Sequence, residues 1–254
     1  MARASALLRA RPVERVPAHV FERSWSTPIE TDPFSVSIAD KVAILTEATD
    51  RARVHDDVRV RESNTGCGVT ERAFGSSAGT YVEQTFYFCG GGIRVVAVDD
   101  DDAQVRSYPN SFGGQWTGGG WEAFEALHVP SYAARHAEEA RELLSAEPCP
   151  RGRYDVLLDS SQLALQIHES CGHPAEADRM FDYEAAYAGG TYLDADALGT
   201  FAFGSPKVTI VADATETGGL GTFGYDDEGV EASRWDLVRD GVFVGVLTDR
   251  EIAA

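Results

Sequence analysis

The chain has 254 residues, enough for one large domain or two modest ones, and a formal net charge of −19 at pH 7. This negative charge repels nucleic acid and anionic membrane surfaces, so we expect neither as a partner. Hydrophobic residues make up 43% of the chain, which excludes wholesale disorder.

The sequence contains four cysteines, none of them in a CxxC pair. A chain of this length does not need disulfides to hold its core, so we expect reduced thiols. No apolar run approaches the length of a membrane span, and the N-terminal region lacks the apolar stretch of a secretory signal. These features favour a cytoplasmic protein.

The chain begins with a proline-containing stretch that we interpret as an irregular N-terminal extension over residues 1–33. Ser37 can cap a helix that runs to about Val54. Over residues 58–108 the pattern changes to alternating apolar strands, and the glycines at 90–92 separate two of them. This pattern predicts an antiparallel meander.

The second half of the chain mixes helical and strand signals. Residues 121–146 predict one helix, and a short apolar run at 154–159 predicts a buried strand, after which a serine at 160 or 161 can cap another helix. An apolar strand at 208–212 follows, and then a hairpin around Asp240-Gly241, a strong turn signal. We therefore predict an α+β fold with a mostly antiparallel sheet and packed helices.

The helix that begins after residue 160 or 161 carries an HExxxH motif. His168 and His173 bracket Glu169, which directly follows the first histidine. Neutral imidazoles bind zinc, the metal acidifies a bound water, and a neighbouring carboxylate takes the proton. The motif therefore predicts a zinc hydrolase; the alternative interpretation is a buried structural His168 and a surface His173.

The spacing of the two histidines requires a distorted helix. Side chains five positions apart differ by about 140° around a regular helix and cannot share one ion. Gly172 can relax the backbone, and Pro174 removes an amide donor and disfavours helical geometry at His173. We expect a π-bulge, or a helix that ends at Gly172, near Gly172-His173-Pro174.

Two carboxylates follow the motif, Glu176 and Asp178. They are candidates for orienting a histidine ring from behind, or they are surface charges on the next turn. Cys171 lies between the histidines and should point to another side of the helix. A catalytic zinc site needs a third protein ligand, and no other histidine has a spacing that identifies it.

Three segments resemble the TldD/PmbA family of metallopeptidases: HESCGHPAEADR, the stretch 205–214, and GTFGYDDEGVEASRWDLVRDGVFVGVLTDR. The intact motif resembles the TldD-type subunit, and the resemblance covers about residues 33–250. It implies a cytoplasmic zinc protease that cleaves unfolded peptides or peptide precursors, with His168 and His173 as Zn2+ ligands and Glu169 as the base. It also implies a dimer, with a PmbA-type partner subunit or with a second copy, and an enclosed site that extended peptides enter.

The resemblance stops short at both ends. Family members carry a further segment before Ser37 and a β-rich C-terminal domain that supplies a cysteine ligand, and this chain matches neither. We therefore expect residues 34–254 to form a TldD-like metallopeptidase region that lacks the C-terminal domain and needs it for the third ligand. The alternatives are a non-catalytic truncated subunit that only pairs with a PmbA-type partner, and a zinc amidase that acts on small molecules.

Overall fold

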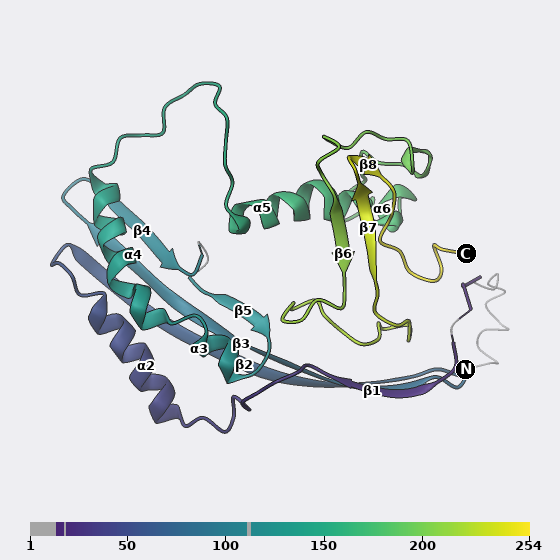
Figure 1. Cartoon of the computed structure of the whole chain (residues 1–254), viewed down its shortest axis with the longest axis horizontal. Coiled ribbons are helices and arrows are strands. Elements are labelled where there is room, and N and C mark those ends of the chain that lie inside the picture. The colour runs from purple at the N-terminus through teal and green to yellow at the C-terminus, as the bar shows by residue number, and fades with distance from the viewer. Residues whose placement is uncertain (1–13, 18, 111–112) are drawn as a thin grey trace. The chain divides into compact units, whose positions relative to one another are not determined.

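The structure, a computed structural model, describes residues 14–17, 19–110 and 113–254. It divides into two compact units. The sheet unit comprises residues 21–157 and 214–226, and the motif unit comprises residues 158–213, 227–254 and the described residues up to Val20. Both units combine helices with strands (Figure 1), which confirms the predicted α+β class. Within the described ranges, no helix has both the length and the apolar character needed to cross a bilayer.

The sheet unit is built around strand β3 (Tyr81–Val98). One edge of β3 pairs antiparallel along its whole length with β2 (Val58–Gly75). The other edge pairs in turn with a parallel strand and two antiparallel strands: β1 (Glu22–Ser26), β5 (Gln115–Gly118) and β4 (Ala103–Tyr108). The sheet is therefore mostly antiparallel, as the sequence predicts.

The glycines at 90–92 do not separate two strands, because β3 runs straight through them. A Cβ atom at Gly90 would lie 2.1 Å from the carbonyl oxygen of Gln115, and one at Gly92 would lie 2.3 Å from that of Tyr108. Both distances are too short for any side chain. These glycines therefore allow close approach of neighbouring backbone rather than ending a strand.

The stretch predicted to be irregular, residues 1–33, contains strand β1. Glu22–Ser26 form it because they find a free edge of β3 beside Tyr81–Thr85. A strand pairing with residues so distant in the sequence leaves little local signal. Residues 1–13 and 18 lie outside the described residues.

Helices cover one side of the core of the sheet unit. The predicted cap is confirmed: helix α2 (Ile38–Arg51) begins after Ser37, whose hydroxyl accepts the Asp40 N–H at 3.1 Å. The single helix predicted over 121–146 is instead two, α3 (Trp121–Glu125) and α4 (Val129–Leu144). His128 between them has a left-handed φ of 49°, and Pro130 has no amide hydrogen with which to extend a preceding helix.

The motif unit holds the HExxxH segment in four consecutive pieces: α5 (Ser160–Ile167), the π-helical turn η1 (His168–Gly172), the 3-10 turn η2 (His173–Ala175) and α6 (Ala177–Met180). A 3-10 turn η3 (Ala195–Ala197) follows, and then a three-stranded sheet of β6 (Ile210–Asp213), β7 (Arg234–Arg239) and β8 (Val242–Phe243). The Asp240-Gly241 hairpin is confirmed. The core of this unit joins the motif to the hairpin through Cys171, Ala175, Leu193, Leu237, Val238 and Phe243.

The buried strand predicted at 154–159 is wrong. These residues form no strand, and Leu157 is fully exposed at 102%. An apolar run makes a strand only where another strand pairs with it, and this segment has no such partner among the described residues. The cap of α5 is Asp159, whose carboxylate accepts the Gln162 N–H at 3.0 Å, rather than either serine.

Candidate metal centre

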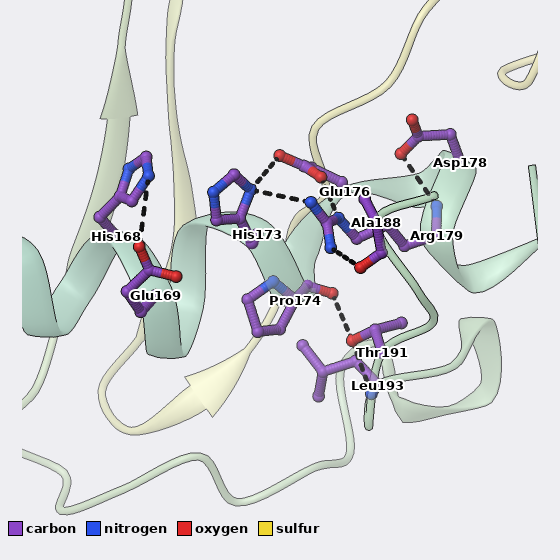
Figure 2. Close-up of polar contacts among 10 residues, drawn as sticks. All are labelled: His168, Glu169, His173, Pro174, Glu176, Asp178, Arg179, Ala188, Thr191 and Leu193. Carbon is purple, nitrogen blue, oxygen red and sulfur yellow. Dashed lines mark hydrogen bonds and ion pairs between the residues drawn. The ribbon is translucent and has the colours of Figure 1, made fainter. Parts of the chain in front are cut away.

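The helix distortion expected from the motif is present and brings the two histidines together. The His173 N–H donates to the His168 carbonyl, five residues earlier instead of four. The extra residue in this turn lets side chains at positions i and i+5 share one side of the helix. The imidazole centroids of His168 and His173 lie 4.4 Å apart, with ring planes at 72° (Figure 2).

The donor set suits a zinc-like ion. His168, Glu169 and His173 each offer one ligand atom, and these atoms lie within 4.8 Å of one another. Two nitrogens bound to tetrahedral zinc at about 2.0–2.1 Å would be about 3.3 Å apart. The side chains of His168, Glu169 and His173 are 59%, 61% and 35% exposed, respectively. Rotation about their torsions can therefore bring the two histidine nitrogens to the spacing that zinc requires. Imidazole nitrogen and carboxylate oxygen are both zinc ligands, so the residues present fit the ion.

Glu176 holds His173 from behind. Its Oε1 lies 2.7 Å from His173 Nδ1, and its other carboxylate oxygen accepts a hydrogen bond from Arg179 (Figure 2). With Nδ1 occupied in this way, Nε2 of His173 is available to a metal. Burial alone would raise the pKa of Glu176, but the hydrogen bonds from Arg179 and His173 outweigh it and hold that pKa below its usual value.

Arg179 also approaches His173, with Nη2 at 3.2 Å from Nδ1. A ring nitrogen that donates its hydrogen to Glu176 has no lone pair for the guanidinium, so these two contacts compete. We assign the hydrogen bond to Glu176 because that contact is shorter, at 2.7 Å, and orients the ring. Arg179 then donates its hydrogen bond to the Glu176 carboxylate, and this hydrogen bond raises the pKa of Arg179.

Asp178 is placed differently from Glu176. Its Oδ1 accepts the Arg179 N–H at 2.9 Å, and it lines a cavity of about 210 Å3 with Glu176 and Asp249. The structure thus brings His168, Glu169, His173 and Glu176 together. Asp178 instead binds the backbone of Arg179. An orienting role for Asp178 stays a prediction.

Cys171 faces the core, as expected. It is fully buried, and this burial raises the pKa of its thiol. Within the described residues, no cysteine and no further histidine joins the group formed by His168, Glu169 and His173. Among the described residues, Glu169 is the one that stands in such a group with the two histidines.

Sequence reasoning missed the segment that supports the motif from outside the helix. Arg179 anchors Glu176 and donates to the Ala188 carbonyl at 3.0 Å, while Thr191 donates to the Pro174 carbonyl at 2.9 Å (Figure 2). No spacing rule connects these residues to the histidines. The signal available in the sequence was Pro174, which has no N–H and so leaves the carbonyl of Ser170 without its regular helical donor.

Two family models together match most of the chain. Residues 31–144 match the PmbA/TldA metallopeptidase central domain, and residues 151–254 match the PmbA/TldA metallopeptidase C-terminal domain. The chain belongs to this family. The HExxxH motif lies within the region matched to the C-terminal domain, residues 151–254. The sequence led us to expect a further β-rich region after this one, and that expectation stays a prediction.

Relatives of this PmbA/TldA member are named metalloproteases. Metalloprotease MJ0996 of Methanocaldococcus jannaschii is 32% identical over 184 residues, which cover 72% of this chain and 37% of the relative. Metalloprotease slr0863 of Synechocystis is 33% identical over 230 residues, which cover 87% of this chain and 45% of the relative. The chain therefore spans less than half the length of either relative.

A solved structure shares the fold. It is described as a proposed modulator of a DNA gyrase from Thermotoga maritima, is 21% identical, and has a TM-score of 0.69 over 89% of this chain and 48% of its own. At this identity the likeness establishes the arrangement of helices and strands. The reaction has to be argued from the site itself.

Proposed function

We propose that this chain provides the metal-binding and proton-transfer residues of a zinc-dependent metallopeptidase that hydrolyses unfolded peptides or peptide precursors. The observation that carries the proposal is the convergence of His168 and His173 at the π-helical turn, with Glu169 beside them. Membership of a metallopeptidase family supports the reaction class. The motif geometry supports the choice of residues.

Each residue has a definite part. His168 and His173 would hold the ion, which when bound supplies a Lewis acid that acidifies water and polarises a carbonyl. Glu169 accepts the proton of the attacking water and later delivers it to the departing amine. Its Oε1 lies 3.8 Å from Nε2 of His168, so it can reach a water beside the histidines. Glu176 keeps the His173 ring in one orientation.

The proposal includes a contribution from outside this segment. If Glu169 is the base, the third ligand comes from beyond the residues described, either from a further region of the polypeptide or from a partner. The exposure of His168, at 59%, leaves room for that group. We propose a dimer, with a PmbA-type subunit or a second copy, in the cytoplasm. The four free cysteines support a reducing compartment.

The test is the zinc content of the purified protein, measured by elemental mass spectrometry alone and after mixing with a PmbA-type subunit. His168→Ala and His173→Ala are the controls. We expect bound zinc that disappears in both variants, while their unfolding temperatures without metal match that of the unmodified protein. A folded protein without zinc under both conditions contradicts the proposal.

A peptide assay then separates the competing functions. Zinc together with cleavage of unfolded peptides supports a peptidase, whereas cleavage confined to small amides supports an amidase. A protein that pairs with its partner without adding activity to it is a non-catalytic subunit. The last two outcomes overturn the proposed reaction.

A further inference from the structure

We propose that Tyr192 is a positioning residue for the metal site, because its hydroxyl holds the backbone of the π-helical turn in the form that unites His168 and His173. This inference rests on the proposed function. Its basis is the hydrogen-bond pattern of the turn, in which the Ser170 carbonyl is left without a helical donor.

The unpartnered carbonyl belongs to Ser170, and Pro174 is the cause. In a regular helix the N–H of residue 174 would donate to the carbonyl four residues earlier, but proline has no N–H. The neighbouring donors are already engaged: the N–H of His173 bonds to His168, and that of Ala175 belongs to the 3-10 turn that Gly172 caps. The Ser170 carbonyl therefore needs a donor from outside the helix.

Tyr192 is that donor. Its hydroxyl donates to the Ser170 carbonyl at 2.7 Å, from a position twenty-two residues further along the chain. This bond holds the Ser170 peptide group in the orientation that it has in the π-helical turn. Regular geometry would return the two histidines to different sides of the helix, so the hydroxyl favours the metal-binding form.

The residues on either side of Tyr192 make its position rigid. Leu193 is buried in the core of the motif unit, with 2% exposure. Thr191 accepts the Leu193 N–H at 3.1 Å and donates to the Pro174 carbonyl at 2.9 Å (Figure 2). The segment 191–193 thus holds the backbone on both sides of His173, through the carbonyls of Ser170 and Pro174.

The aromatic ring of Tyr192 contributes less than its hydroxyl. The residue is 59% exposed, and its ring centroid lies 6.1 Å from that of Phe201. Tyr192→Phe therefore removes the hydrogen bond and preserves most of the packing. Tyr187→Phe is the matched control, because Tyr187 is 96% exposed in the same unit.

The experiment is a Co2+ titration of the full chain, with its partner subunit if zinc binding requires one, followed through the d–d absorption of the bound ion. We expect Tyr192→Phe to raise the Kd for Co2+ about 10-fold and to alter the absorption envelope at saturation, as disruption of ligand-supporting contacts does. Tyr187→Phe should match the unmodified chain in both respects. Unfolding temperatures without metal verify that all three proteins are folded.

The outcomes separate the two proposals. If the unmodified chain does not bind Co2+, the proposed function fails. If it binds and Tyr192→Phe gives the same Kd and the same spectrum, the metal site stands and the role of Tyr192 is overturned. A changed Kd with an unchanged spectrum also overturns it, because the proposed role is to set ligand geometry.

Discussion

His173 uses its two ring nitrogens for different tasks, with Nδ1 bound to Glu176 at 2.7 Å and Nε2 available to a metal. Sequence spacing could identify Glu176 as a candidate, because residues three apart are neighbours on a helical turn. Spacing could not show that Arg179 anchors this carboxylate. That contact depends on where Arg179 places its guanidinium, and a sequence does not contain this information.

Replacing the proposed base tests its role directly. Glu169→Gln keeps the shape of the side chain and removes its basicity, so peptide cleavage should fall by about 10²–10⁴-fold while the zinc content stays near that of the unmodified protein. Steady-state peptide hydrolysis and elemental analysis measure the two quantities. Glu147→Gln, at an exposed position in the sheet unit, is the control. Loss of zinc together with activity would make Glu169 a ligand instead.

Replacing the carboxylate behind His173 should weaken metal binding. Glu176→Gln removes the charge that orients the ring, and we expect the zinc Kd to rise about 10–100-fold. Competition with a chromophoric chelator gives this value. Asp178→Asn should leave the Kd unchanged, because Asp178 binds a backbone N–H. Equal effects of the two substitutions would show that general charge, rather than the hydrogen bond, matters.

At the scale of elements, the distortion of the motif helix was predictable but its cause was only partly identified. Gly172 has φ −56° and ψ −67°, a right-handed conformation open to any residue. A Cβ atom there would come no closer than 3.9 Å to the Ile167 carbonyl oxygen. Pro174, and not glycine, therefore imposes the break, because it removes the N–H that a regular helix needs.

This difference gives a prediction that contradicts the usual expectation for a motif glycine. Gly172→Ala should fold normally and retain zinc, and its free energy of unfolding should be equal or higher by about 0.5–1 kcal/mol, because alanine loses less backbone entropy on folding. Urea unfolding and zinc analysis measure both. A loss of zinc would mean that the turn needs the greater freedom of glycine after all.

The elements that sequence reasoning placed well are those specified by neighbouring residues. The Ser37 cap and the Asp240-Gly241 turn depend on hydrogen bonds and torsions within a few positions. The continuity of β3 through Gly90–Gly92 depends on backbone more than fifteen residues away, so local patterns could not reveal it. Strand β1 was missed for the same reason.

At the scale of the whole molecule, the chain passes between its two units four times. The segment 214–226 leaves the motif unit and belongs to the sheet unit. Gln84, which is 6% exposed, holds it: Oε1 accepts the N–H groups of Gly224 and Tyr225 at 3.0 and 2.9 Å, and Nε2 donates to the Tyr225 carbonyl at 2.8 Å. One buried amide thus satisfies three backbone groups.

Removing this amide should destabilise the sheet unit. Gln84→Met keeps the size of the side chain and leaves buried backbone groups without partners, so we expect a loss of about 1–3 kcal/mol in the free energy of unfolding. Gln104→Met, which removes a contact with exposed Asp102, should cost far less. Urea denaturation compares the two. Similar losses would show that segment 214–226 does not depend on Gln84.

The returning segment has a consequence for how this sequence can evolve. The two matched regions, 31–144 and 151–254, look like modules that recombination could exchange between related genes. Yet the second region carries Gly224 and Tyr225, which complete the buried contacts of Gln84 in the first, and Gly224 fits against Trp25 only because it has no side chain. A crossover between the regions would separate these partners, so the two halves should be inherited as one block.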